Sequence, residues 1–282
     1  MWGISYWVFP VISALCWLGM LLGLLISWNV DGKPQYASMD PTQDIAYISD
    51  VGAAHLKPLF IAGACVTTIF LDLAFISERW LRHTGRLARN TTVTEKILSG
   101  LSMIAAIVGT CGLILLSIFD TAHYPRTHNI MLALFIGGYV ISAVFICWEY
   151  QRLGIHFREH AVLRRSFWIK LVFIFVELGL AIGFGVCNLK DEYDAAAVLE
   201  WAIAFIFTFY VLSFFVDLYP AVHTKNRKFA TAETEMQREA NDGMSDARVY
   251  NGNRNTVDSE RTLTNPHLDN VERPKPAVAR NF

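Results

Sequence analysis

Six long apolar stretches constrain the fold of this chain more than any other feature of its sequence. Each is about 20 residues long, enough for an α-helix to cross about 30 Å of hydrocarbon. A helix in the core of a water-soluble protein rarely stays apolar on every side over that length. The stretches are approximately residues 6–28, 58–76, 97–119, 130–148, 167–187 and 198–218. The sequence therefore predicts an all-α fold: a polytopic membrane protein with a six-helix transmembrane bundle.

The Lys and Arg residues between the apolar stretches are unevenly shared and so predict an orientation. Five lie in residues 78–96 and four in residues 151–166. The loops on the other side hold two before the second stretch and one in each of the two later loops. An excess of Lys and Arg marks the cytoplasmic side of a membrane protein. We therefore expect both chain ends in the cytoplasm and three loops on the outer or lumenal face.

The end of the chain differs in composition from residues 1–220, which form the predicted membrane domain. Residues 221–282 have few large apolar side chains and many Asn, Asp, Glu, Arg and Thr residues. Such a segment cannot bury enough apolar area to offset the entropy of ordering, so we expect a disordered cytoplasmic tail. Its first basic residues, Lys225, Arg227 and Lys228, are a candidate contact for anionic lipid. Charges at this place also serve simply to stop translocation.

Polar residues that flank the spans on the predicted outer face form a candidate site. They are Asp50, His55, Asp120, His123 and Glu200. Asp and His residues that face each other across loops are able to bind a metal ion or to perform acid–base chemistry. Helix capping and hydrogen bonds between loops explain the same residues about equally well. Because no HExxH, GxSxG or paired CxxC motif occurs, we expect no enzymatic activity, no metal, no cofactor and no nucleic-acid partner.

Two of the carboxylic acids within the predicted spans are candidate intramembrane sites, because ionisable groups there are costly and often functional. Asp72 is in the inner third of the second span, and Glu177 is near the middle of the fifth. A proton site or a polar-lipid site is the functional interpretation, and a structural hydrogen bond between helices is the alternative. Lys170 lies near the cytoplasmic end of the fifth span, where we expect its ammonium group to reach the interface.

Small residues within the spans predict places where helices approach closely. They are the GxxxG pairs Gly19/Gly23 and Gly179/Gly183, together with Gly109, Gly112, Gly137 and Gly138.

Several of these residues stand in an arrangement that resembles a known family. The arrangement consists of Tyr47-Ile-Ser-Asp-Val-Gly52 followed by Pro58, then Asp120 and His123, then Glu200-Trp201, Phe209-Tyr210 and Asp217. With these residues the chain resembles the Frag/DRAM/Sfk family of six-span membrane proteins over about residues 5–220. Its polar, basic tail is similar to that of the fungal Sfk-type members.

The resemblance implies a lipid-related role more than a particular chemistry, because fold alone does not define function. A resemblance to the Sfk-type proteins implies a plasma-membrane location, support of a phosphoinositide 4-kinase and control of phospholipid asymmetry. A resemblance to the DRAM proteins implies a lysosomal or other endomembrane location and a role in autophagy. A further branch implies lipid exchange on GPI anchors.

Three functional hypotheses follow. The first is a non-enzymatic regulator of membrane lipid organisation, in the plasma membrane or alternatively in the vacuole, lysosome or another endomembrane. Its partners would be membrane lipids and a phosphoinositide kinase complex bound through the cytoplasmic loops and tail. The second is a factor that remodels GPI anchors or other lipids through the outer Asp and His residues. The third is a lipid translocator with Glu177 and Asp72 on its path.

Overall fold

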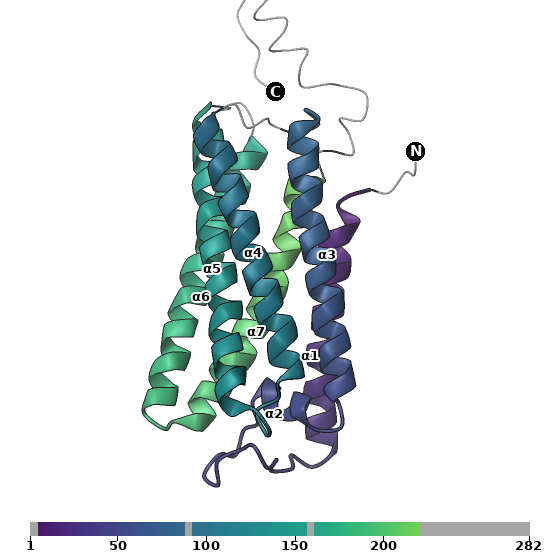
Figure 1. The fold of residues 1–282 in the computed structure, drawn as a ribbon, viewed down its shortest axis with the longest axis vertical. Coiled ribbons are helices and arrows are strands. Elements are labelled where there is room, and N and C mark those ends of the chain that lie inside the picture. The colour runs from purple at the N-terminus through teal and green to yellow at the C-terminus, as the bar shows by residue number, and fades with distance from the viewer. Residues whose placement is uncertain (1–4, 88–91, 157–160, 220, 222–282) are drawn as a thin grey trace, which may run out of the picture. The chain divides into compact units, whose positions relative to one another are not determined.

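The computed structural model of the chain describes residues 5–87, 92–156, 161–219 and 221, and these residues form helices and short connections (Figure 1). The predicted lipid contact of Lys225, Arg227 and Lys228 lies outside the described residues, as does nearly all of the predicted tail.

The described residues form seven helices and no strand. The helices are α1 (Val8–Val30), α2 (Ile48–Ala53), α3 (Lys57–His83), α4 (Val93–Ile118), α5 (Pro125–His156), α6 (Ala161–Leu189) and α7 (Tyr193–Leu218). All except the short α2 are long and apolar enough to span a membrane. The predicted all-α, six-span fold class is confirmed.

Most helices extend further than the apolar stretches predicted. Helix α3 continues to His83, past the expected end at residue 76, and α5 continues to His156, past residue 148. The apolar stretches end where charged residues become frequent, whereas α3 and α5 continue past these residues, and Arg79 and Arg82 form ion pairs there. The expected loop boundaries at 78 and 151 were therefore wrong, and Arg79 and Arg82 belong to α3.

The six long helices run alternately up and down and form a closed ring. Each contacts its neighbours in the order α1, α3, α4, α5, α6 and α7, and α7 returns to α1. The short helix α2 and the loop of residues 31–47 lie at one end, together with the first turns of α3, α5 and α7 (Figure 1). We call this end of the helices the α2 end, and the end that carries Glu78 and Arg82 the opposite end.

Glycines bring α4 and α5 into direct backbone contact. A Cβ atom placed on Gly138 would lie 2.5 Å from the backbone nitrogen of Gly109, and one on Gly112 would lie 2.5 Å from that of Phe135. By contrast, a Cβ atom on Gly19 or Gly179 would meet nothing within 4 Å. The close approach predicted from glycine is thus confirmed for α4 and α5, while these first glycines of the two GxxxG pairs face open space.

Candidate functional site

Asp50 is a buried hydrogen-bond centre at the α2 end. Its carboxylate accepts hydrogen bonds from the Ser38 hydroxyl at 2.6 Å and from the backbone N–H of Tyr47 at 3.0 Å. The side chains of Gln43 and Thr121 each approach it at 3.5 Å. Burial raises the pKa of Asp50 above its ordinary value, and these donors partly offset that effect. Asp50 therefore fastens residues 38–47 to the first turn of α2.

The first turns of α7 hold the same segment from the other side. The Glu200 carboxylate accepts a hydrogen bond from the backbone N–H of Ile48 at 2.7 Å, so it caps α2. The Trp201 indole donates to the carbonyl oxygen of Ala46 at 3.0 Å. One oxygen of Asp194 accepts from the backbone N–H groups of Asp44 and Ile45, both at 2.8 Å. The Glu200-Trp201 pair thus has a structural explanation, because it clamps the loop that precedes α2.

Asp120 forms an ion pair at the start of α3. Its carboxylate lies 2.5 Å from the Lys57 ammonium and is only 4% exposed. The backbone N–H of His123 donates to it at 2.7 Å, and the His123 ring nitrogen lies 2.8 Å away. Burial alone would raise the pKa of Asp120, but hydrogen bonds from Lys57 and His123 hold it well below its usual range. The His123 side chain is 75% exposed.

The five predicted outer-face residues therefore do not form one open site. Asp50 and Asp120 lie near each other, because Thr121 contacts Asp50, and Glu200 caps the adjoining helix. His55 lies apart and exposed, 3.3 Å from Ser27 and 3.8 Å from Asp31. Within the described part of the chain, no three His, Cys, Asp or Glu side chains are gathered as a metal ion would require.

The two intramembrane acids have different surroundings. Asp72 accepts hydrogen bonds from the Thr110 hydroxyl at 3.1 and 3.2 Å, and that hydroxyl lies 2.9 Å from the Tyr139 hydroxyl. This chain of contacts joins α3, α4 and α5. Glu177 on α6 instead lines a cleft, and its buried Oε1 atom has no hydrogen-bond partner among the described residues. Asp72 fits the structural interpretation, whereas Glu177 does not.

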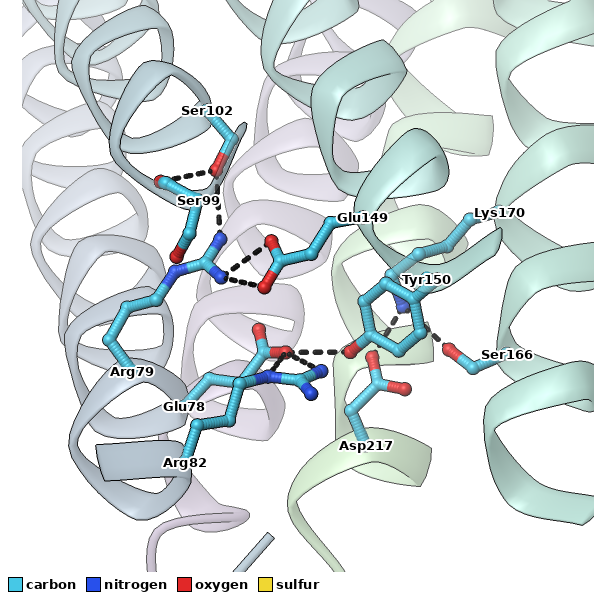
Figure 2. Close-up of polar contacts among 10 residues, drawn as sticks. All are labelled: Glu78, Arg79, Arg82, Ser99, Ser102, Glu149, Tyr150, Ser166, Lys170 and Asp217. Carbon is cyan, nitrogen blue, oxygen red and sulfur yellow. Dashed lines mark hydrogen bonds and ion pairs between the residues drawn. The ribbon is translucent and has the colours of Figure 1, made fainter. Parts of the chain in front are cut away.

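A network of three buried ion pairs at the opposite end was not predicted from the sequence (Figure 2). Arg82 pairs with Glu78 at 2.8 Å within α3, and the Tyr150 hydroxyl of α5 donates to the same carboxylate at 2.7 Å. One nitrogen of Arg79 lies 2.6 Å from both carboxylate oxygens of Glu149. The network therefore joins α3 firmly to α5.

Lys170 of α6 and Asp217 of α7 form the third pair of this network. The Lys170 side chain is fully buried, and the Ser166 hydroxyl lies 3.0 Å from its ammonium. Its ammonium also lies 5.2 Å from the centre of the Tyr150 ring (Figure 2). The centre of the Phe214 ring is 4.1 Å away. The expectation that Lys170 extends to the interface was wrong, because Asp217 and two aromatic rings hold it inside the bundle.

The sequence does contain signals of this network. Glu78 and Arg82 have the i, i+4 spacing of a helical ion pair. Glu149 and Asp217 are acidic residues close to the ends of spans, and the next Lys or Arg residues after them in the sequence are Arg152 and Lys225. Three acids matched to three bases indicate a closed, charge-balanced layer rather than an open binding surface.

Comparison with known proteins agrees with this architecture. Residues 5–221 match the family described as the Frag1/DRAM/Sfk1/Cwh43P N-terminal domain. Protein sfk1 of Schizosaccharomyces pombe is 31% identical over 222 residues, covering 78% of this chain and 66% of that protein. Protein SFK1 of Saccharomyces cerevisiae is 26% identical over 279 residues, covering 76% of this chain and 78% of that protein. No solved structure matches the chain. With six membrane-spanning helices and a match over most of its length, the chain belongs to the Frag1/DRAM/Sfk1/Cwh43P N-terminal domain family.

Proposed function

We propose that this protein is a non-enzymatic integral membrane regulator of lipid organisation, with both termini in the cytoplasm. The plasma membrane is the proposed location, with the vacuole, lysosome or another endomembrane as the alternative. The observation that carries the proposal is that the acids at the α2 end form hydrogen bonds within the fold. Asp50, Asp120 and Glu200 each accept hydrogen bonds from neighbouring loops or helices, so their oxygens serve the architecture.

The opposite end supplies the proposed contact surface for partners. Lys96, Arg164 and Arg165 have exposed side chains there, around the buried ion-pair network. Basic side chains at a membrane surface attract anionic lipid head groups with about 1 kcal/mol each. We propose that these residues contact anionic lipids and a phosphoinositide kinase complex on the cytoplasmic side. The network beneath them would keep the helix ends in fixed positions.

A lipid-remodelling factor is the second candidate, and one observation favours it. The exposed His123 ring lies 2.8 Å from the buried Asp120 carboxylate. A carboxylate that orients a solvent-accessible imidazole is a common arrangement for a general base. Such a pair would act on a lipid head group at the outer face.

A translocator is the third candidate. Asp72 lies on α3 and Glu177 on α6, and Asp72 is not among the residues that line the cleft of Glu177. A polar path through both acids would therefore require a rearrangement of the helices.

The His123→Ala variant separates regulation from catalysis. The His123 side chain is 75% exposed, and Asp120 and Tyr124, which are near it in the sequence, supply its hydrogen bonds and ring contact, so its removal should leave the fold intact. The wild-type chain and the variant are each expressed in cells that lack the endogenous relative. Surface exposure of aminophospholipids is measured with a fluorescent probe, and total lipid species are measured by mass spectrometry. A regulator alters lipid distribution without creating new lipid species, and we expect His123→Ala to behave like the wild type.

The control is His55→Ala, which removes an exposed imidazole that is not paired with Asp120. New lipid species that depend on His123, but not on His55, would overturn the regulatory proposal in favour of lipid remodelling. A wild-type chain that leaves aminophospholipid exposure unchanged would also contradict it.

A further inference from the structure

The cleft of Glu177 is a feature of the described bundle that the proposed function leaves unused. It lies chiefly between α5, α6 and α7, and its volume is about 930 Å³, including the part open to the surroundings. Apolar and aromatic side chains make up most of its walls, among them Phe135, Val140, Phe173 and Phe207. A cleft of this composition within membrane-spanning helices is suited to hydrocarbon rather than to a water-soluble ligand.

The helix that bears Glu177 is the most loosely packed of the six. Only 11% of the most apolar window of α6 is buried, against 33–44% for the other long helices. In Figure 1, α6 diverges from α5 as it approaches the end of the bundle that we call the α2 end. The other helices therefore cover little of α6, which forms one wall of the cleft.

Glu177 gives the cleft a polar centre that lacks a partner. Its Oε1 atom is buried without a hydrogen bond to any described residue. A buried polar atom without a partner is costly, so an occupant that donates a hydrogen bond there gains affinity. The position is deep, since Glu177 is 12 residues from Leu189, or about 18 Å along the helix.

We propose that this cleft binds a neutral membrane lipid whose head is a hydroxyl group, which donates a hydrogen bond to Glu177. Two features exclude a phosphate head group. The described residues that line the cleft include no Lys, Arg or His, and they include a second carboxylic acid, Glu200. A phosphate would therefore meet two acids and no cation. A small, uncharged hydroxyl is also the head group that is easiest to bury at this depth.

Photo-crosslinking to the purified full chain in phosphatidylcholine nanodiscs tests the site. Three clickable diazirine probes are compared: a sterol, a diacylglycerol and a phosphatidylcholine. The first two carry a free hydroxyl and no phosphate, so they distinguish the possible sources of the ligand. We expect at least one of them to label peptides of α5 and α6 and to be displaced by its unlabelled counterpart. The phosphatidylcholine probe should not label these peptides in a displaceable way.

Variants of Glu177 test the hydrogen bond itself. Glu177→Leu removes the acceptor and should weaken binding about tenfold, which corresponds to about 1.4 kcal/mol. Glu177→Gln keeps an acceptor oxygen and should remain within about twofold of the wild type. Val140→Phe narrows the cleft without touching the acid and should also reduce labelling. The matched control is Asp72→Asn, which alters an intramembrane acid outside the cleft and should leave labelling unchanged.

Three results would overturn the proposal: no displaceable labelling by either hydroxyl probe, equal labelling by the phosphatidylcholine probe, or labelling that survives both Glu177→Leu and Val140→Phe. The inference does not depend on the regulatory function, because the assay reads binding and not lipid distribution. Loss of binding with normal aminophospholipid exposure would leave the regulatory proposal standing.

Discussion

The buried pair of Lys170 and Asp217 permits a quantitative prediction about stability. The Lys170 side chain is 0% exposed and that of Asp217 is 3% exposed, so neither charge reaches solvent. Removal of one partner from such a pair costs about 3–5 kcal/mol, because the other charge stays buried and uncompensated. The two single variants should nevertheless differ in cost, because the two charges have different remaining contacts.

Lys170→Met should be the more damaging change. It leaves the Asp217 carboxylate inside the bundle, where its Oδ1 atom has no hydrogen-bond partner among the described residues even in the intact protein. We expect a loss of about 5 kcal/mol, at the upper end of the range. Asp217→Leu leaves Lys170 against the rings of Phe214 and Tyr150 and near Ser166. A desolvated cation–π contact contributes about 2 kcal/mol, so the expected loss is about 3 kcal/mol.

The double variant Lys170→Met/Asp217→Leu completes the cycle. Replacement of a whole buried pair by apolar residues is often nearly neutral, so we expect a loss within about 1 kcal/mol of the wild type. Unfolding of the purified chain in detergent is followed by intrinsic fluorescence of its eight tryptophans during denaturant titration. Additive losses in the double variant, or single losses below about 1 kcal/mol, would refute the assignment of these residues as a coupled pair.

The fold class could be predicted from the sequence because a bilayer imposes a strict requirement. Each crossing needs about 20 apolar residues, and the sequence shows six such stretches directly. Helix α2 was not predicted, since it is only six residues long and depends on a cap from Glu200, which is 152 residues away from Ile48. A short helix held by distant contacts leaves little local signal.

The polar contacts were predictable only in part, because many of them join residues that are far apart in the sequence. Tyr150 meets Glu78 across 72 residues, and Lys170 meets Asp217 across 47 residues. Residue spacing along one helix does not reveal such pairings, and single residues near span ends were therefore assigned to the interface. Glu177 could be singled out because a central acid in an apolar span is rare, but the cleft it lines requires the arrangement of α5, α6 and α7.

Two further predictions concern the packing of α4 against α5 and the acid sensitivity of the α2 end. Gly138→Ala should destabilise the protein by about 1–3 kcal/mol, because its Cβ atom would overlap the backbone of Gly109, whereas Gly137→Ala, with nothing within 4 Å, should not. For Asp120, hydrogen bonds from Lys57 and His123 depress the folded-state pKa. The stabilising effect of the Asp120 carboxylate is therefore complete above its ordinary pKa of about 4, and it is lost as the pH falls through the lower folded-state pKa. The difference in unfolding temperature between wild type and Asp120→Asn should be largest near neutral pH and should shrink below about pH 4. Comparison with the variant isolates this group from Asp50, whose raised pKa favours the folded state at low pH. A difference in unfolding temperature that stayed constant from pH 6 to pH 3 would contradict the depressed folded-state pKa of Asp120 and the hydrogen bonds that explain it.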